Sequence, residues 1–145
     1  MKSIILIIVI LLAGAFSGCV NSKQLTSHSG ETKISDILTN PRNYTNNVVI
    51  RGTVSNVLNT QTQTPPVTYT TYFELDDSTG KMWTATQAQT PISIQVDTKV
   101  TVTGFLMSGF RSTAINKTFD QIIFASPNDI IIFPTATIQT SNQSR

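Results

Sequence analysis

The chain has 145 residues, which is enough for one domain of ordinary size, and charged residues make up only 12% of it. A formal net charge of +2 is not the composition of a protein that binds polyanions through charge alone. The single cysteine excludes an intramolecular disulfide, so a small apolar core must hold the domain together.

The N-terminus combines a basic start with an unbroken apolar run from Ile4 to Leu12. This apolar segment is too short to cross a bilayer, and it predicts a secretory signal peptide over residues 1–18. The stretch Phe16-Ser17-Gly18-Cys19 resembles the lipobox of prokaryotic lipoproteins. That resemblance implies that Cys19 is lipidated and anchors the protein to the outer, extracytoplasmic face of the cell membrane. The alternative is an uncleaved signal anchor in which Cys19 has no special role.

The segment after the signal peptide, residues 19–33, is polar and shows no apolar period. Its Ser, Thr, Gln and Gly content predicts a flexible tether between the lipidated cysteine and the domain. The only histidine, His28, lies in this segment without Cys, Asp or Glu partners at ligand spacing. We therefore expect His28 to be a solvated residue and not a metal ligand.

A short helix is predicted next, because three apolar residues recur at positions i, i+3 and i+4. These residues are Ile34, Ile37 and Leu38. Thr32 or Ser35 is expected to cap the helix, and Pro41 ends it by pushing the preceding residue out of helical geometry. We expect the helix to close one end of a β-structure.

Alternation of apolar and polar residues predicts strands through most of the remaining chain. The expected strands are Asn47–Leu58, Val67–Asp76, Lys81–Thr86, Lys99–Met107, Phe119–Ala125 and Ile130–Phe133. A mobile loop is expected over Ser108–Thr118, and a disordered polar tail over residues 134–145. Gly52 in mid-strand predicts a bend that lets the first strand serve two sheets of a small barrel, and Gly104 repeats this pattern.

These elements are similar, in their order, to an OB-fold domain. The resemblance rests on Ile37-Leu38, Asn40-Pro41 and Tyr44, then on Val48–Val54, Phe73–Gly80 and Lys99–Gly104. It covers residues 34–133 and implies an all-β fold, a five- to six-stranded Greek-key barrel with a short N-terminal helix. OB-fold families include single-strand nucleic-acid binders, a periplasmic bacterial family and the haem chaperone of cytochrome c maturation. The haem chaperone attaches haem through a histidine near the end of the domain, and no histidine follows Phe119, so we expect no haem. No other cofactor is expected.

The sequence offers few groups for catalysis. Cys19 is assigned to the anchor and His28 to the tether, which leaves Asp76 and Asp77 beside Glu74. This acidic stretch is typical of a solvated hairpin turn, since a calcium site needs about six to eight oxygen ligands in a fixed geometry. We expect no metal site, no catalytic residue and no enzymatic activity.

Binding is the stronger hypothesis, because OB folds bind ligands on the face of strands two and three. If Phe73, Leu75 and Met82 point inward, Tyr72 and Trp83 point outward and could stack bases or sugars. The charges of the site would come from Arg51, Lys81, Arg111 and Lys117. Tyr72 and Trp83 could instead be packing residues, and the net charge disfavours an oligonucleotide. The sequence therefore predicts a monomeric OB-fold binding module whose ligand it does not identify, with an oligonucleotide and an oligosaccharide as candidates.

The alternative function is that of a structural or accessory envelope lipoprotein. The apolar strand Ile130–Phe133 would invite another protein chain if it formed an uncovered edge. We expect the N-terminal helix to cover it instead. Three sequences match glycosylation acceptors, and they begin at Asn43, Asn116 and Asn142.

Overall fold

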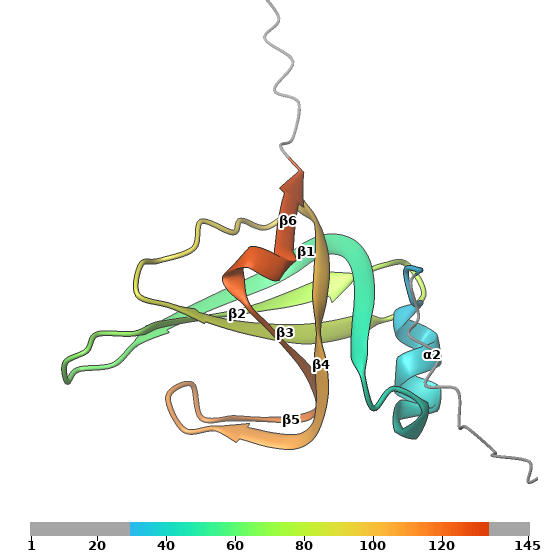
Figure 1. Cartoon of the computed structure of the whole chain (residues 1–145), viewed down its shortest axis with the longest axis horizontal. Helices are drawn as coiled ribbons and strands as arrows, with labels where there is room; N and C mark the ends of the chain where they lie inside the picture. The colour runs from blue at the N-terminus through green and yellow to red at the C-terminus, as the bar shows by residue number, and fades with distance from the viewer. Residues whose placement is uncertain (1–29, 134–145) are drawn as a thin grey trace, which may run out of the picture.

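The computed structural model describes residues 30–133, which form one short α-helix, two single-turn 3-10 helices and six strands (Figure 1). The helices are α2 (Ile34–Thr39), η1 (Pro41–Asn43) and η2 (Pro127–Asp129). The strands are β1 (Asn47–Gln61), β2 (Tyr69–Asp76), β3 (Lys81–Ala88), β4 (Lys99–Ser112), β5 (Lys117–Ala125) and β6 (Ile130–Phe133). The predicted signal peptide, Cys19, His28 and the tail with Asn142 lie outside the described residues.

Five of the strands close into a ring. β1 pairs with β2, β2 with β3, β3 with β5, β5 with β4, and β4 returns to β1. All of these pairings are antiparallel except β3 with β5, which is parallel. β6 adds to the outer edge of β4. This strand order is that of the OB-fold, so the predicted all-β barrel with a short N-terminal helix is confirmed.

Gly52 lies where β1 passes from one neighbour to the other. Gly52 pairs with Val100 of β4, whereas the next residue, Thr53, already faces Asp76 of β2. A Cβ atom on Gly52 would lie 2.8 Å from the carbonyl oxygen of Asp76, well inside van der Waals contact. The prediction that Gly52 lets the first strand serve two parts of the barrel is therefore confirmed.

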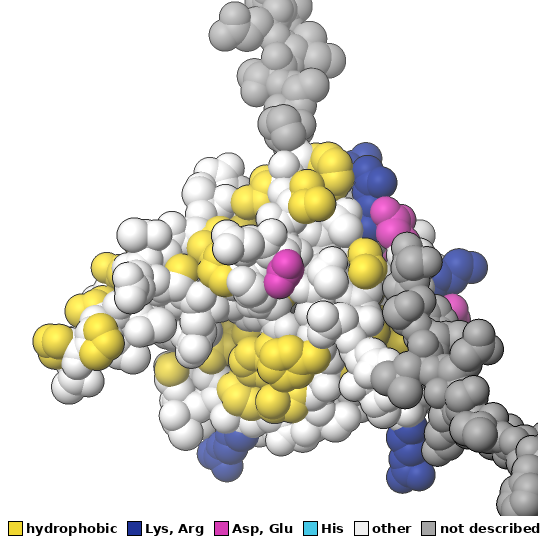
Figure 2. Space-filling model, viewed as in Figure 1, with side chains coloured by type: hydrophobic (Ala, Val, Ile, Leu, Met, Phe, Trp, Pro, Cys, Tyr) yellow, Lys and Arg dark blue, Asp and Glu magenta, His cyan; other side chains and the backbone are white. Residues whose placement is uncertain are grey.

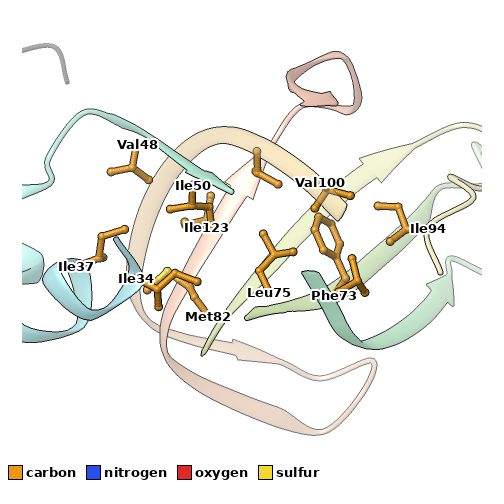
Figure 3. Packing of buried hydrophobic residues seen from close by; sticks show 12 residues of the cluster. Ile34, Ile37, Val48, Ile50, Phe73, Leu75, Met82, Ile94, Val100 and Ile123 are labelled. Carbon is orange, nitrogen blue, oxygen red and sulfur yellow. The ribbon is translucent and has the colours of Figure 1, made fainter. Parts of the chain in front are cut away.

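The barrel interior is one apolar core that also receives the helix (Figure 3). Ile34 and Ile37 of α2 are fully buried and pack with residues from five of the strands. The link between β3 and β4 forms no helix, and its Ile94 also enters the core. Each fully buried aliphatic side chain contributes about 1.5–3 kcal/mol to folding, so α2 is held chiefly by its two isoleucines.

The N-terminus of α2 is not capped as the sequence predicts. Lys33 occupies the N-cap position, and neither Thr32 nor Ser35 caps the helix through its side chain. The Ile34 N–H instead donates to Asp77 Oδ2 at 2.8 Å, from the β2–β3 turn 43 residues away. Thr32, predicted in the tether, is buried and its N–H donates to the Val49 carbonyl, so the folded domain includes it.

The ionised Asp77 carboxylate joins the β2–β3 turn to α2 by accepting hydrogen bonds from both. Burial raises the pKa of Asp77, but hydrogen bonds from the Ile34 N–H, from Thr79 and from the Gly80 N–H outweigh it and hold the pKa below the ordinary 3.8. Since the folded-state pKa is depressed, the ionised carboxylate stabilises the fold above the unfolded-state pKa. That stabilisation is lost as the pH falls through the folded-state pKa.

We therefore expect Asp77→Asn to lower the free energy of unfolding by about 1–2 kcal/mol at neutral pH. The difference from the parent chain should shrink to near zero in acid, as Asp77 becomes protonated. Urea denaturation over a pH series measures both values. Asp120→Asn, at an exposed carboxylate, is the matched control and should change little. An Asp77→Asn deficit that stays constant into acid would contradict the role of the charge.

The structure replaces the predicted loop Ser108–Thr118 with a strand hairpin, which we call the β4–β5 arm. β4 continues to Ser112, and its Arg111 pairs with Thr118 of β5. Gly109 adopts a φ of +67°, a conformation that costs glycine little and lets the arm bend. The loop prediction is wrong because Phe110 and Phe119 pair across this hairpin and pack over Tyr72.

The N-terminal helix α2 does not cover β6, contrary to the prediction. α2 lies at a different side of the barrel from β6 (Figure 1). Ile131 and Ile132 of β6 remain 57% and 39% exposed. The expectation that the N-terminal helix buries this apolar strand is therefore wrong, and β6 is an edge strand.

Candidate ligand-binding face

The outer face of β2 and β3 is set by the pairing register of the two strands. Leu75 faces Met82, and Phe73 points with them into the core. Alternation then places Tyr72 and Trp83 on the opposite side of the sheet. The prediction that Phe73, Leu75 and Met82 point inward is confirmed. Tyr72 and Trp83 point outward, as predicted.

Tyr72 is only 5% exposed, because the β4–β5 arm packs over it. Its ring stacks on that of Phe119, with the centroids 5.9 Å apart and the planes within 8° of parallel. Its hydroxyl lies 3.0 Å from Ser112 Oγ, in a hydrogen bond whose donor is either group. The interpretation of Tyr72 as an exposed stacking residue is therefore wrong, since it belongs to a second apolar core outside the barrel.

Trp83 is half-buried at the rim of this second core. The Phe119 ring lies 5.5 Å from the Trp83 ring at a tilt of 57°. The ammonium of Lys117 lies 3.6 Å from the centroid of the Trp83 ring and 5.2 Å from that of Phe119. This is cation–π geometry, and it brings together two residues that the sequence predicted from separate segments. We call Trp83 with Lys117 the Trp83–Lys117 pair.

Of the other predicted cations, Lys81 lies on the same face as this pair. Lys81 precedes Trp83 by two residues on the same face of β3, and its Nζ lies 3.6 Å from Asp76 Oδ2. Both side chains are substantially exposed, so this ion pair is weak. Arg111 is exposed on the β4–β5 arm, but it pairs with Thr118, so alternation places its side chain on the opposite face of the arm from Lys117.

The same face also carries a carboxylate. Glu74 sits directly opposite Trp83 in the β2–β3 register, and its Oε2 accepts a hydrogen bond from the Ser55 hydroxyl at 2.8 Å. With Asp76 beside Lys81, the face therefore holds charges of both signs around one partly exposed indole ring.

Arg51 does not join these residues. Its guanidinium carbon lies 4.7 Å from the centroid of the Phe133 ring, and its Nη1 lies 3.5 Å from Glu31 Oε1. Arg51 instead lines a groove of about 590 Å³ at the Gly52 bend, together with Lys99 and with Asp76, the ion-pair partner of Lys81. The predicted binding set is thus divided between the surroundings of the Trp83–Lys117 pair and this groove.

Sequence reasoning missed the aromatic residues that build the second core. Phe110 and Phe119 pair across the β4–β5 arm, and Phe110 also meets Phe124 edge-on at 4.9 Å between centroids. An aromatic residue near each end of the expected loop was the signal that could have indicated a hairpin. Figure 2 shows the resulting hydrophobic patch where β3, β4 and β5 meet.

Two negative findings concern the described part of the chain alone. Within residues 30–133, no three Cys, His, Asp or Glu side chains are grouped so that they could hold a metal ion. Over the same range, no helix has the length and apolar character needed to span a membrane.

Comparison with known proteins gives only distant likenesses. No protein-family model matches the chain, and no curated protein matches its sequence. The structure is similar to an aspartyl-tRNA synthetase from Entamoeba histolytica, with 14% identity and a TM-score of 0.47 over 73% of this chain and 23% of that one. A chain described as an aspartyl-tRNA synthetase from Leishmania major Friedlin gives 16% identity and a TM-score of 0.45, over 75% of this chain and 22% of that one. The protein therefore spans less than a quarter of either synthetase, and its OB-fold assignment rests on its own strand order.

Proposed function

We propose that the protein is a lipid-anchored, extracytoplasmic OB-fold module that binds a ligand and catalyses no reaction. The apolar run Ile4–Leu12 and the resemblance of Phe16-Ser17-Gly18-Cys19 to a lipobox support the proposed anchor and location. The only cysteine and the only histidine of the chain precede the domain, which leaves residues 34–133 without a thiol or an imidazole for catalysis.

The Trp83–Lys117 pair is the observation that carries the binding proposal. OB folds bind oligonucleotides and oligosaccharides on the face that includes β3, together with the adjoining loops. Trp83 lies on this face, and the Lys117 ammonium covers part of its ring. A flat sugar or base would stack on the exposed part of the indole, and Lys117 would turn from the ring to the oxygens of the ligand.

The charges around Trp83 favour a sugar over a base. Without Lys2 in the signal peptide, nine lysines and arginines face eight aspartates and glutamates in the mature chain. Glu74 and Asp76 on the ligand face would repel the phosphates of a nucleic acid. We therefore place oligosaccharides first among the ligands, and single-stranded nucleic acid second.

Fluorescence of Trp83, the only tryptophan, tests this function directly. The full chain in detergent is titrated with a neutral oligosaccharide and, separately, with a single-stranded oligothymidylate. A saturable emission change on adding the oligosaccharide, with an affinity that does not depend on salt, indicates a sugar-binding site. A saturable change on adding the oligothymidylate, with an affinity that falls as the salt concentration rises, indicates a nucleic-acid site. Unchanged emission with both ligands at millimolar concentration would refute binding on this face.

The anchor has its own test. We expect Cys19→Ser to release the protein from the membrane fraction, because a lipidated cysteine supplies acyl chains worth about 0.8 kcal/mol per buried methylene. Fractionation of cells that express the parent or the Cys19→Ser chain measures the release. His28→Ser, in the same segment, is the control and should stay with the membrane. Retention of Cys19→Ser in the membrane fraction would contradict the lipid anchor.

Docking of another envelope protein is the second candidate function. The exposed edge strand β6 favours it, since Ile131 is 57% exposed on a strand that pairs with β4 alone among the described strands. This candidate makes no use of Trp83, so the fluorescence titration separates the two.

A further inference from the structure

The strand β6 has one free edge and two exposed faces. It pairs with β4 alone among the described strands, through Ile130–Phe133 against Lys99–Val102. Ile131 and Ile132 point to opposite faces, and both remain exposed. Figure 1 shows β6 reaching beyond the end of the barrel. An unpaired edge with apolar side chains on both faces can accept a further strand, which would complete its backbone hydrogen bonds.

The two ends of this edge carry opposite charges. Asp129, just before β6, is exposed, and within residues 30–133 its carboxylate makes no hydrogen bond or ion pair. At the other end, the Arg51 guanidinium lies over the ring of Phe133. The contact of Arg51 with Glu31 is exposed and long at 3.5 Å, so it leaves the guanidinium available to a further carboxylate.

We propose that β6 pairs antiparallel with β6 of a second copy of this chain, around a twofold axis at Ile131. In this register each Asp129 faces Phe133 of the second copy, where Arg51 supplies the opposite charge. Ile131 and Phe133 share one face of β6, and Asp129 ends the η2 turn directly before the strand, so the charged groups stand at the two ends of the isoleucine pair. The edge is therefore complementary to itself, as a twofold interface requires.

The charge pattern is what selects a second copy over an unrelated partner. An envelope protein that docks on this strand would need a basic group and an acidic group of its own at the matching positions. An antiparallel copy matches both ends at once, because the same Asp129 and Arg51 meet twice across the axis. The inference does not rest on the proposed ligand binding, since it uses β1 and β6 and leaves the Trp83–Lys117 pair uncovered.

Disulfide trapping in the full chain tests the pairing. Ile131→Cys places two thiols opposite each other across the axis, at a separation that a disulfide can span. Mild oxidation should then yield at least about tenfold more covalent homodimer than the parent chain, because cross-strand neighbours on one face lie within bonding distance. The parent chain measures the background from Cys19. Met107→Cys, at an exposed position of β4 away from the edge, measures random collision. Homodimer yields equal to those of Met107→Cys, or cross-links to other proteins alone, would overturn the proposal.

A charge exchange provides the second test and guards against misfolding of one variant. In the Ile131→Cys background, Asp129→Arg or Arg51→Asp alone should lower the homodimer yield by about tenfold, since like charges then meet at both ends. The chain that carries both changes restores opposite charges and should regain a yield close to that of Ile131→Cys. Circular dichroism checks that each variant is folded. A double variant that pairs as poorly as the single ones would overturn the register and the choice of partner.

Discussion

Replacing Gly104 with valine is expected to lower the free energy of unfolding by about 3 kcal/mol or more, enough to unfold a domain of marginal stability. β4 passes at this residue from β1 to β5, since Gly104 pairs with Val48 and the next residue already faces Phe124. A Cβ atom on Gly104 would overlap the carbonyl oxygen of Phe124 and lie 2.7 Å from Ile123 Cγ2. The obstacle is chiefly backbone, so no side-chain rotation can relieve it.

Gly30→Val provides the matched control for this substitution. A Cβ atom on Gly30 would meet no atom within 4 Å, so we expect a change within about 0.5 kcal/mol. Urea denaturation followed by circular dichroism measures both variants against the parent chain. If Gly104→Val proves as stable as Gly30→Val, the close approach of β4 and β5 at this corner is not as described.

Phe119→Ala is expected to cost about 3–5 kcal/mol, the usual loss for a buried phenylalanine. The Phe119 ring is 3% exposed and contacts the rings of Tyr72, Trp83 and Phe110 at centroid distances between 5.5 and 6.2 Å. Its removal should loosen the β4–β5 arm from the outer face of β2 and β3. Trp83 emission should shift to the red, because the indole then meets more water.

Phe105→Ala is the matched control for Phe119→Ala, since Phe105 is 48% exposed on the same strand pair. We expect it to cost about 1 kcal/mol or less. Denaturant unfolding and the emission maximum of Trp83 are measured for both variants. Equal losses of stability, with no red shift for Phe119→Ala, would contradict a second core built on Phe119.

The barrel could be predicted because its signals are local. Alternation fixed the inward residues Phe73, Leu75 and Met82, and mid-strand glycines marked the corners at Gly52 and Gly104. The interaction that caps the N-terminus of α2 could not be predicted, because the capping residue, Asp77, lies 43 residues away in the sequence. Sequence-based prediction of helix caps considers only residues near the helix terminus, and it therefore favoured Thr32 and Ser35.

The binding face was predicted only in part, for a related reason. Alternation places Tyr72 and Trp83 on the outer side of the sheet, but it cannot say what covers that side. The β4–β5 arm covers this outer side of the sheet, and no apolar periodicity in the sequence predicts its bend at Gly109. Lys117 and Trp83 meet only because the arm folds back, while Arg51 lines the groove at Gly52 and contacts Phe133.

The affinity of Trp83→Leu for the probe that binds in the fluorescence titration, oligosaccharide or oligothymidylate, tests the central claim most directly. Calorimetry is the method, because this variant has no tryptophan to follow. A stacked ring is worth about 1–3 kcal/mol, so Trp83→Leu should weaken binding by about tenfold, while leucine preserves apolar contact with Phe119. Arg51→Ala, in the groove at Gly52, should bind like the parent chain. Unchanged affinity for Trp83→Leu, or a loss confined to Arg51→Ala, would contradict the account and move the site to the groove at Gly52.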